Sequence, residues 1–248
     1  MSLLTVDRVS KSFGGLQAVH QVSFALAEGE TLGLIGPNGA GKTTLFHLIC
    51  GFLEPDEGSV TYAGASLAGL RPHEICQRGM VRTFQIARPF LRLTVMENVI
   101  VGALERVAHR REAMVIAQEI LDLTGLAEKA ANLGHSLTLP DRKRLELARA
   151  LATRPRVLLL DEVMAGLTPT ETGRLIDLIR TIHGRGVTIL LIEHVMKAVM
   201  ALSQRVMVLN YGELIAQGAP EEVVRNPKVI EAYLGEGYAE PDAGWGPC

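Results

Sequence analysis

Residues 36–44 read Gly36-Pro37-Asn38-Gly39-Ala40-Gly41-Lys42-Thr43-Thr44. This stretch matches the pattern G-x-x-x-x-G-K-[ST], the P-loop. An apolar run over 31–35 precedes it and indicates a short strand, while residues 45–50 have the pattern of a helix. A strand, a Gly-rich loop and a helix in this order form the context in which such a loop binds phosphate.

Each part of this loop has a predicted contact with a polyphosphate. A helix N-terminus offers free N–H groups and a partial positive charge to an anion, and glycines let the backbone curl closely around it. Lys42 can reach the β- and γ-phosphates, and the Thr43 hydroxyl can bind Mg²⁺. The alternative of a flexible Gly turn is disfavoured by the flanking strand and helix. A Rossmann loop is excluded because no G-x-G-x-x-G spacing fits these glycines.

The composition limits the class of protein. The chain has 248 residues, of which 48% are hydrophobic, enough for one α/β domain with a subdomain or for two small domains. The formal net charge of −2 gives no basic field for nucleic acid. Three widely spaced cysteines favour a reducing compartment over a disulfide framework or a zinc site. We see no signal peptide and no apolar run of about 18–20 residues, and therefore expect a cytoplasmic chain that docks at any membrane it serves.

A second decisive stretch is the apolar run 157–160, which ends in Asp161 and Glu162. Such a run is typical of a central parallel strand that is buried on both faces. Ligands of open α/β sheets bind at the carboxyl ends of strands, so Asp161 is placed to hold Mg²⁺ and Glu162 to polarise an attacking water. The alternative, an acidic helix cap after a strand, is disfavoured by the P-loop.

A third apolar run, 187–192, ends in Glu193-His194. A lone histidine after a strand is more often structural. Here the strand would run parallel to the Asp161 strand, so the imidazole of His194 can reach the same γ-phosphate.

The rest of the chain contains shorter signals. Strands are predicted over 3–7, 22–26, 59–62 and 81–84, a helix over 71–79, a hairpin over 206–217, a closing helix over 220–234 and a loose tail over 236–248. In residues 87–155 the apolar residues mostly recur with the period of a helix, which indicates a helical subdomain inserted into an α/β core.

Two segments of the helical block are informative. Thr94 to Glu97 fits a helix capping box. The segment 137–141 opens another helix, whose stripe Leu147, Ala150 and Leu151 is predicted to face a core. This second helix is either an ordinary capped helix or a second N-terminus aimed at an anion.

Two single residues are ambiguous by themselves. Phe13, in a loop with Gly14 and Gly15, either stacks on an adenine ring or plugs the core. Gln85 ends a predicted strand, which alone indicates little.

The order of these motifs resembles the nucleotide-binding subunit of an ABC transporter across nearly the whole chain. The resemblance implies an α/β P-loop NTPase (RecA-like) core over 1–86 and 155–235, with an antiparallel β subdomain. It also implies a helical subdomain over 87–154, an ABC ATPase domain over 1–235 and a flexible tail over 236–248.

The resemblance also assigns roles to residues. ATP and Mg²⁺ are the expected ligands, with Phe13 on the adenine and residues 137–141 as the signature segment that presents Thr138 to the nucleotide of a second subunit. Residues 165–168 would form the D-loop. The expected Mg²⁺ ligands are Thr43, Gln85 and Asp161, and the expected catalytic residues are Lys42, Gln85, Glu162 and His194.

Finer features are similar to the ATPases of branched-chain amino-acid importers. They comprise Phe13-Gly14-Gly15, Arg82-Thr83-Phe84-Gln85, Ala165-Gly166-Leu167-Thr168-Pro169-Thr170-Glu171, Ile192-Glu193-His194 and the segment 229–235. The implied partners are two transmembrane permease subunits, a second ATPase subunit (a different chain or a second copy) and, indirectly, an external substrate-binding protein, at the cytoplasmic face of the inner membrane. Alternatives are a urea or amide transporter, a soluble ABC-type ATPase, or a regulatory subunit with weak catalysis.

One departure from the family pattern matters. The fourth signature position, usually glycine, is Pro140, which has no N–H to donate to phosphate. Asp141 adds a negative charge there. We expect a weakened half-site that works opposite a different ATPase or hydrolyses ATP slowly. Smaller departures are Val163, where proline is usual, and Thr168, where aspartate is common.

Overall fold

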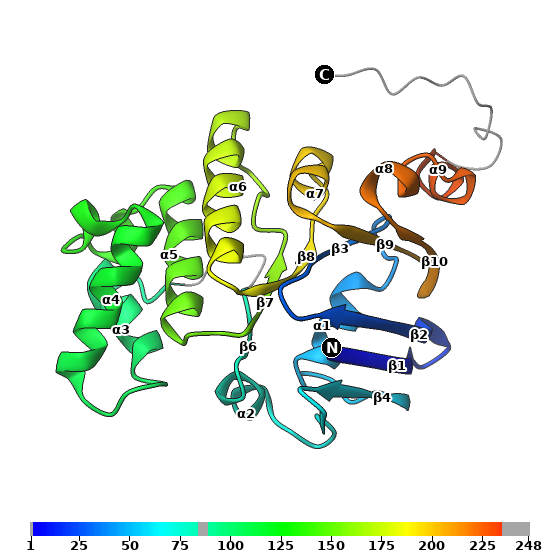
Figure 1. Cartoon of the computed structure of the whole chain (residues 1–248), viewed down its shortest axis with the longest axis horizontal. Coiled ribbons are helices and arrows are strands. Elements are labelled where there is room, and N and C mark those ends of the chain that lie inside the picture. Colours follow the sequence, from blue (N-terminus) through cyan, green and yellow to red (C-terminus); the bar gives the residue numbers. More distant parts are fainter. Residues whose placement is uncertain (1, 84–88, 235–248) are drawn as a thin grey trace.

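A six-stranded sheet lies at the centre of the computed structural model, which describes residues 2–83 and 89–234 (Figure 1). In sheet order its strands are β10 (Glu213–Gly218), β9 (Arg205–Asn210), β3 (Thr31–Ile35), β8 (Thr188–Ile192), β7 (Val157–Asp161) and β6 (Met80–Arg82). Every neighbouring pair is parallel except β10 with β9. The carboxyl ends of the five parallel strands therefore share one edge.

Strands β3, β7 and β8 are buried at every residue. In β7, Val157 and Leu159 pack on one side of the sheet, and Leu158 and Leu160 pack on the other. This two-faced burial explains the continuous apolar runs and confirms the predicted central strands.

A second, antiparallel sheet has the order β2-β1-β4-β5. It contains β1 (Ser2–Phe13), β2 (Leu16–Ala27), β4 (Glu57–Tyr62) and β5 (Ala65–Ser66). Helix α1 (Lys42–Ile49) lies between the two sheets and shares one core with both (Figure 1). The first two strands are much longer than predicted. Register shifts, with Arg8 and Gln21 at positive φ, break the period of two on which the prediction relied.

Three helices form a separate layer with its own core, seen at the left of Figure 1. They are α3 (Val95–Ala103), α4 (Arg110–Thr124) and α5 (Leu139–Ala152), with short 3₁₀ turns at Ala127–Lys129 and Gly134–Ser136. The capping box of α3 is confirmed, since the Thr94 hydroxyl accepts the Glu97 N–H and the Glu97 carboxylate accepts the Thr94 N–H. The boundaries of this unit at 87 and 154 stay a prediction.

The predicted stripe on α5 is buried, and it joins this layer to the central sheet. Leu147, Ala150 and Leu151 share a core with β7 and with α6 (Pro169–Gly184). Helix α2 (Pro72–Gln77) precedes β6, and α7 (Met196–Leu202) follows β8. No helix among residues 2–83 and 89–234 is long and apolar enough to cross a bilayer.

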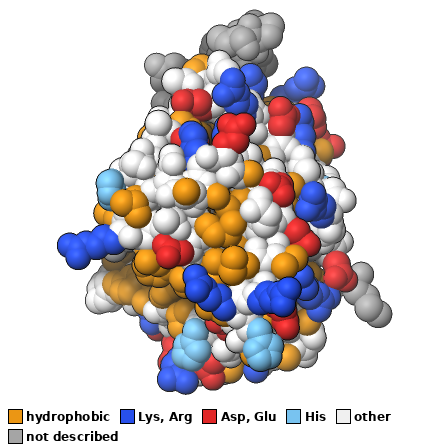
Figure 2. Space-filling view, turned by 90° about the vertical axis from the view of Figure 1, so that its left-hand side faces the viewer, with side chains coloured by type: hydrophobic (Ala, Val, Ile, Leu, Met, Phe, Trp, Pro, Cys, Tyr) orange, Lys and Arg blue, Asp and Glu red, His pale blue; other side chains and the backbone are white. Residues whose placement is uncertain are grey.

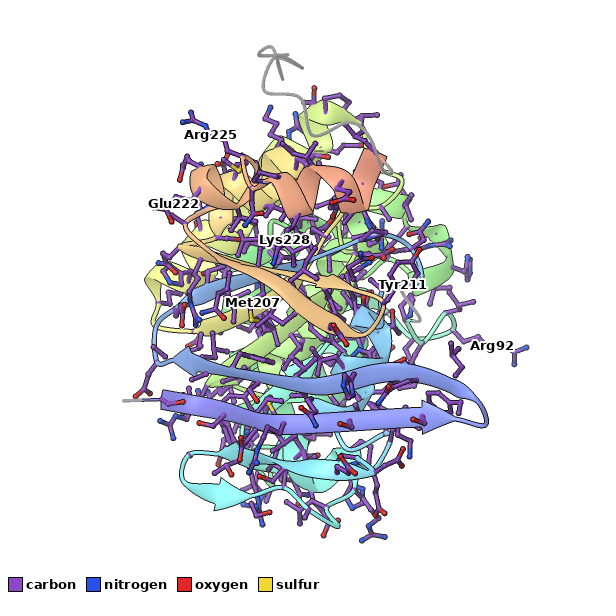
Figure 3. All side chains as sticks on the ribbon, turned by 90° about the vertical axis from the view of Figure 1, so that its right-hand side faces the viewer. Arg92, Met207, Tyr211, Glu222, Arg225 and Lys228 are labelled. Atoms are coloured by element: carbon purple, nitrogen blue, oxygen red, sulfur yellow. The ribbon has the colours of Figure 1, made fainter. Side chains whose placement is uncertain are left out.

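The single closing helix predicted over 220–234 is wrong. Two helices occupy this range, α8 (Pro220–Val223) and α9 (Pro227–Leu234). Pro227 has no N–H and pushes the residue before it out of the helical conformation, so the chain breaks there and restarts. Figure 3 shows these helices above the β9–β10 hairpin, whose turn carries Tyr211.

Candidate active site

The polar residues that the sequence singled out gather at the carboxyl edge of the central sheet. Strand β3 leads into the P-loop, β7 ends at Asp161, and β8 lies between them and leads into Glu193-His194. A parallel sheet brings such strand ends to one crevice, which is where ligands bind in open α/β folds. The predicted parallel arrangement of the Asp161 and His194 strands is confirmed.

The P-loop is already curled around the ammonium group of Lys42. The Nζ atom donates hydrogen bonds to the carbonyl oxygens of Gly36 at 2.7 Å and Pro37 at 2.9 Å. Burial lowers the pKa of Lys42, and the negative charges of Glu162 and Asp161 oppose that shift. The Lys42 Nζ atom is thus enclosed at the centre of the loop, close to two carboxylates.

Two P-loop glycines are required by the protein itself. A Cβ on Gly36 would lie 2.1 Å from the carbonyl oxygen of Leu209, and one on Gly41 would lie 2.2 Å from that of Ala18. Gly39 has open space around it and needs only its φ of +80°. Gly36 and Gly41 therefore allow a close approach to the protein's own backbone, in addition to the predicted approach to phosphate. Gly39 has no such neighbour.

Asp161 is almost completely buried and forms an ion pair with Arg82. Its Oδ2 atom lies 2.6 Å from Nη2 of Arg82, and the two side chains are 4% and 6% exposed. The guanidinium group also lies 5.7 Å from the Phe46 ring centroid and 5.9 Å from that of Phe52. The carboxylate that we expect to hold Mg²⁺ thus already binds a cation. No local sequence pattern indicates this pairing.

Removing Arg82 is expected to destabilise the fold strongly. An Arg82→Ala variant leaves the Asp161 carboxylate buried without its cation, which costs about 3–5 kcal/mol in comparable buried pairs. Urea denaturation followed by circular dichroism measures the free energy of unfolding. Arg225→Ala, which removes an exposed arginine (Figure 3), is the matched control, expected within about 0.5 kcal/mol of the parent. A loss below about 1 kcal/mol for Arg82→Ala would contradict the pairing.

Glu162 and His194 are in direct contact. The Nε2 atom of His194 lies 2.6 Å from Oε1 of Glu162. A carboxylate oxygen can only accept, so Nε2 donates this bond. The Glu162 side chain is 17% exposed and that of His194 39%. The pair therefore opens towards solvent, where a nucleotide and a water molecule can enter.

The signature segment has an unexpected internal arrangement. Thr138 is the N-cap of α5, but its hydroxyl donates to the Asp141 carboxylate at 2.7 Å and makes no capping bond to an N–H of that helix. Lys129 forms an ion pair with the same carboxylate. Burial raises the pKa of Asp141, but the bonds from Lys129 and Thr138 outweigh it and the net pKa is lowered. The charge of Asp141 is thus balanced inside this chain, which weakens the expectation that it repels phosphate.

The start of α5 also reaches the Glu162 turn, since Nζ of Lys143 lies 3.4 Å from the carbonyl oxygen of Glu162. Thr168, one of the departures from the family pattern, caps α6, where its hydroxyl accepts the Glu171 N–H. A structural role therefore accounts for threonine at that position.

Other predicted positions have different outcomes. Phe13 ends β1 and is 47% exposed, which excludes the core-plug alternative. Thr43 is exposed in the first turn of α1. Gln85 lies outside the described residues. Tyr233 of α9, to which the sequence assigns no role, also reaches the P-loop. Burial raises the pKa of its hydroxyl, and a hydrogen bond with the Gly36 backbone opposes the shift.

This geometry agrees with the comparisons to known proteins. A family model described as "ABC transporter" matches residues 19–165, more than half of the chain. The chain belongs to the ABC transporter family. It is an ATP-binding subunit of that family, whose ATP-binding domains hydrolyse ATP. A second model, "Branched-chain amino acid ATP-binding cassette transporter", matches residues 213–239.

Individual relatives cover nearly the whole of this ABC ATPase. It is 45% identical to the high-affinity branched-chain amino acid transport ATP-binding protein LivG of Salmonella typhimurium, over 94% of this chain and 98% of the relative. It is 34% identical to the lipopolysaccharide export system ATP-binding protein LptB of Haemophilus influenzae, over 96% and 99%. A crystal structure of a nucleotide-free ATP-binding cassette from an ABC transporter shares 30% identity and a TM-score of 0.86, over 95% of this chain and all of that one. These matches confirm the predicted fold class.

Proposed function

We propose that this ABC ATPase powers the import of branched-chain, hydrophobic amino acids from the cytoplasmic face of the inner membrane. The match of residues 213–239 to the branched-chain amino-acid model carries the proposal, because that segment contains β10, α8 and α9 rather than the ATP-binding motifs common to the family. The 45% identity to LivG, against 34% to LptB, supports import of amino acids over export of lipopolysaccharide.

The proposed site uses the residues gathered at the sheet edge. Phe13 stacks on the adenine, the P-loop from Gly36 to Thr44 surrounds the phosphates, and Lys42 exchanges the carbonyls of Gly36 and Pro37 for phosphate oxygens. Phosphoryl transfer needs mainly positioning and neutralisation of charge. Preformed donors at the strand ends supply both.

The oxygen donors present fit Mg²⁺, a hard cation that is bound through one or two carboxylates together with substrate phosphates. Thr43, Asp161 and Gln85 would hold it, and it would neutralise charge that develops on the transferred phosphoryl group. The ion pair with Arg82 supports this role, because the Asp161 carboxylate already binds one positive charge. Arg82 must share this carboxylate when the ion binds.

Glu162 acts as the general base in this proposal. Its carboxylate takes a proton from the attacking water, while His194 moves from Glu162 towards the γ-phosphate. In the structure described here the two side chains bind each other. The base is therefore occupied until a nucleotide gives His194 another partner.

The proposed assembly contains two permease subunits, a second ATPase and, indirectly, an external substrate-binding protein. Figure 2 faces the helical layer and shows hydrophobic side chains gathered there. Large exposed hydrophobic residues of α3 and α4 include Val101, Met114 and Val115. An exposed apolar surface of this kind supports a protein contact on the helical layer.

Affinity purification from detergent-solubilised membranes of the native host tests this assembly. We expect polytopic permeases and a second, different ATPase to co-purify. Permeases together with this chain alone would show that two Pro140 half-sites suffice. Recovery of ribosomes, DNA or no partner would contradict the transport proposal and favour a soluble ABC-type ATPase.

If the missing N–H at Pro140 weakens the signature segment, restoring it should raise ATP turnover. Pro140→Ala and Pro140→Gly both restore a backbone N–H near the N-terminus of α5, and a charge-assisted hydrogen bond is worth about 1.5–3 kcal/mol. We expect ATP turnover by the chain acting as a homodimer to rise by about tenfold in both variants. If both variants raise turnover equally, the gain comes from the restored N–H, because only glycine would also make the backbone more flexible. Turnover at or below the parent level in both would show that Pro140 is not limiting.

A further inference from the structure

Glu193 is a buried acidic residue that the proposed mechanism does not use. It follows β8 directly, precedes His194, and is only 2% exposed. Acidic side chains are rarely buried this deeply unless they are paired. It lies between the turn that follows β7 and the segment that follows β8, so its carboxyl group needs hydrogen-bond donors from these two loops.

The carboxyl group of Glu193 accepts backbone N–H groups from both loops. One oxygen accepts the N–H of Met164 at 2.8 Å, on the turn that follows β7. The N–H groups of His194 and Val195 donate to the same carboxyl group. A single side chain therefore links the turn that carries Glu162 to the segment that carries His194.

The turn that Glu193 holds has a strained backbone. Glu162 has a φ of +48°, a left-handed conformation that is uncommon for a residue with a long side chain. Its own N–H donates to the carbonyl oxygen of Ile192 at 2.9 Å, and the bond from Met164 to Glu193 follows two residues later. Both restraints come from the end of β8, so this strand end keeps Glu162 in the conformation that reaches His194.

We propose that Glu193 is a positioning residue that sets the geometry of the Glu162–His194 pair by binding the backbone of both loops. The inference rests on the catalytic roles proposed above for Glu162 and His194. Without this carboxyl group, the N–H of Met164 loses its acceptor. The turn can then relax, and Glu162 can leave its left-handed conformation. The 2.6 Å contact between Glu162 and His194 then loses its support from the backbone.

Fold stability does not explain a carboxyl group at this position. Burial raises the pKa of Glu193 to about 7, while the backbone hydrogen bonds from Met164, His194 and Val195 oppose that shift. A folded-state pKa above the unfolded value means that the folded protein binds the extra proton, so stability falls as the pH rises from about 4.5 to about 7. At neutral pH the charged form is therefore a cost to folding.

Two substitutions of similar size separate positioning from filling space. Glu193→Met keeps the volume but cannot accept the N–H groups, whereas Glu193→Gln retains one acceptor oxygen. In the full-length chain we expect Glu193→Met to lower the kcat for ATP hydrolysis about 10- to 100-fold, with the KM for ATP within about twofold of the parent. Glu193→Gln should recover kcat to within about threefold of the parent.

The control variant is Glu97→Ala, which also removes a carboxylate that accepts a backbone N–H, that of Thr94 at 2.8 Å. It lies in the helical layer and should leave kcat unchanged even where it lowers the melting temperature. If kcat of Glu193→Met stays within twofold of the parent, or if Gln and Met lower it equally, the positioning role is wrong.

A double variant shows whether Glu193 acts through Glu162. If it does, Glu193→Met added to Glu162→Gln lowers the residual hydrolysis no further, because the base is already lost. A further loss as large as in the parent background would assign Glu193 a separate, structural effect. Parent-level turnover in Glu162→Gln alone would instead contradict the proposed role of Glu162, so the two failures are distinguishable.

Discussion

Replacing Glu162 with glutamine is expected to stop most ATP hydrolysis while leaving ATP binding intact. A positioned general base contributes about 10²- to 10⁴-fold to a rate, so kcat should fall at least about 100-fold. Glutamine keeps an oxygen that accepts the His194 Nε2 proton, so the 2.6 Å contact and the local fold are preserved. The loss would therefore report proton transfer rather than a damaged site.

Single-turnover hydrolysis together with equilibrium ATP binding measures both effects in the Glu162→Gln variant. Binding should stay within about threefold of the parent, and ATP should remain unhydrolysed in the complex. Glu97→Gln removes a similar charge from the capping box of α3 and serves as the matched control. Near-parental turnover in Glu162→Gln would remove this residue from the catalytic role.

Replacing Lys42 with methionine is expected to abolish tight ATP binding. The ammonium group is buried among P-loop carbonyls that phosphate oxygens would replace. Two charge-assisted hydrogen bonds at about 1.5–3 kcal/mol each correspond to an affinity loss of at least about 100-fold. Methionine keeps the apolar stem of the side chain, so packing within α1 is retained.

Equilibrium titration with Mg²⁺ and a fluorescent ATP analogue measures this loss. Lys228→Met is the control, because Lys228 is an exposed lysine on α9 (Figure 3) to which no phosphate contact is assigned. Its affinity should match that of the parent. An affinity of Lys42→Met within tenfold of the parent would contradict the assigned contact with the phosphates.

The central strands were predictable because burial on two faces leaves a strong local pattern. Strands β3, β7 and β8 are buried and almost entirely apolar, and each ends at or directly before a segment of the site. Positions with weaker local signals were predicted less well. Bulges concealed the full length of β1 and β2, and the break before Pro227 was missed although the proline itself indicates it.

The site was predictable only where residues come from a motif. The P-loop, the Asp161-Glu162 pair and His194 carry sequence signatures. Arg82 and Glu193 lie in family-like segments, but those segments gave no contact for either side chain. Their partners lie far away in the chain, and a charged residue in sequence resembles a solvated one. Arg82 contacts Asp161 across a strand pair, and Glu193 contacts Met164 across a sheet edge. Only the fold reveals such contacts.

The central claim is that ATP hydrolysis by this chain drives the import of branched-chain amino acids. The most direct measurement is the ATPase rate of the purified transporter complex in proteoliposomes, with its substrate-binding protein supplied empty, loaded with leucine or loaded with urea. We predict a several-fold stimulation by the leucine-loaded protein alone, on the order of the 5- to 150-fold range of allosteric couplings, and its loss in Glu162→Gln. Stimulation by urea instead of leucine, or a rate that no loaded protein changes, would contradict the claim.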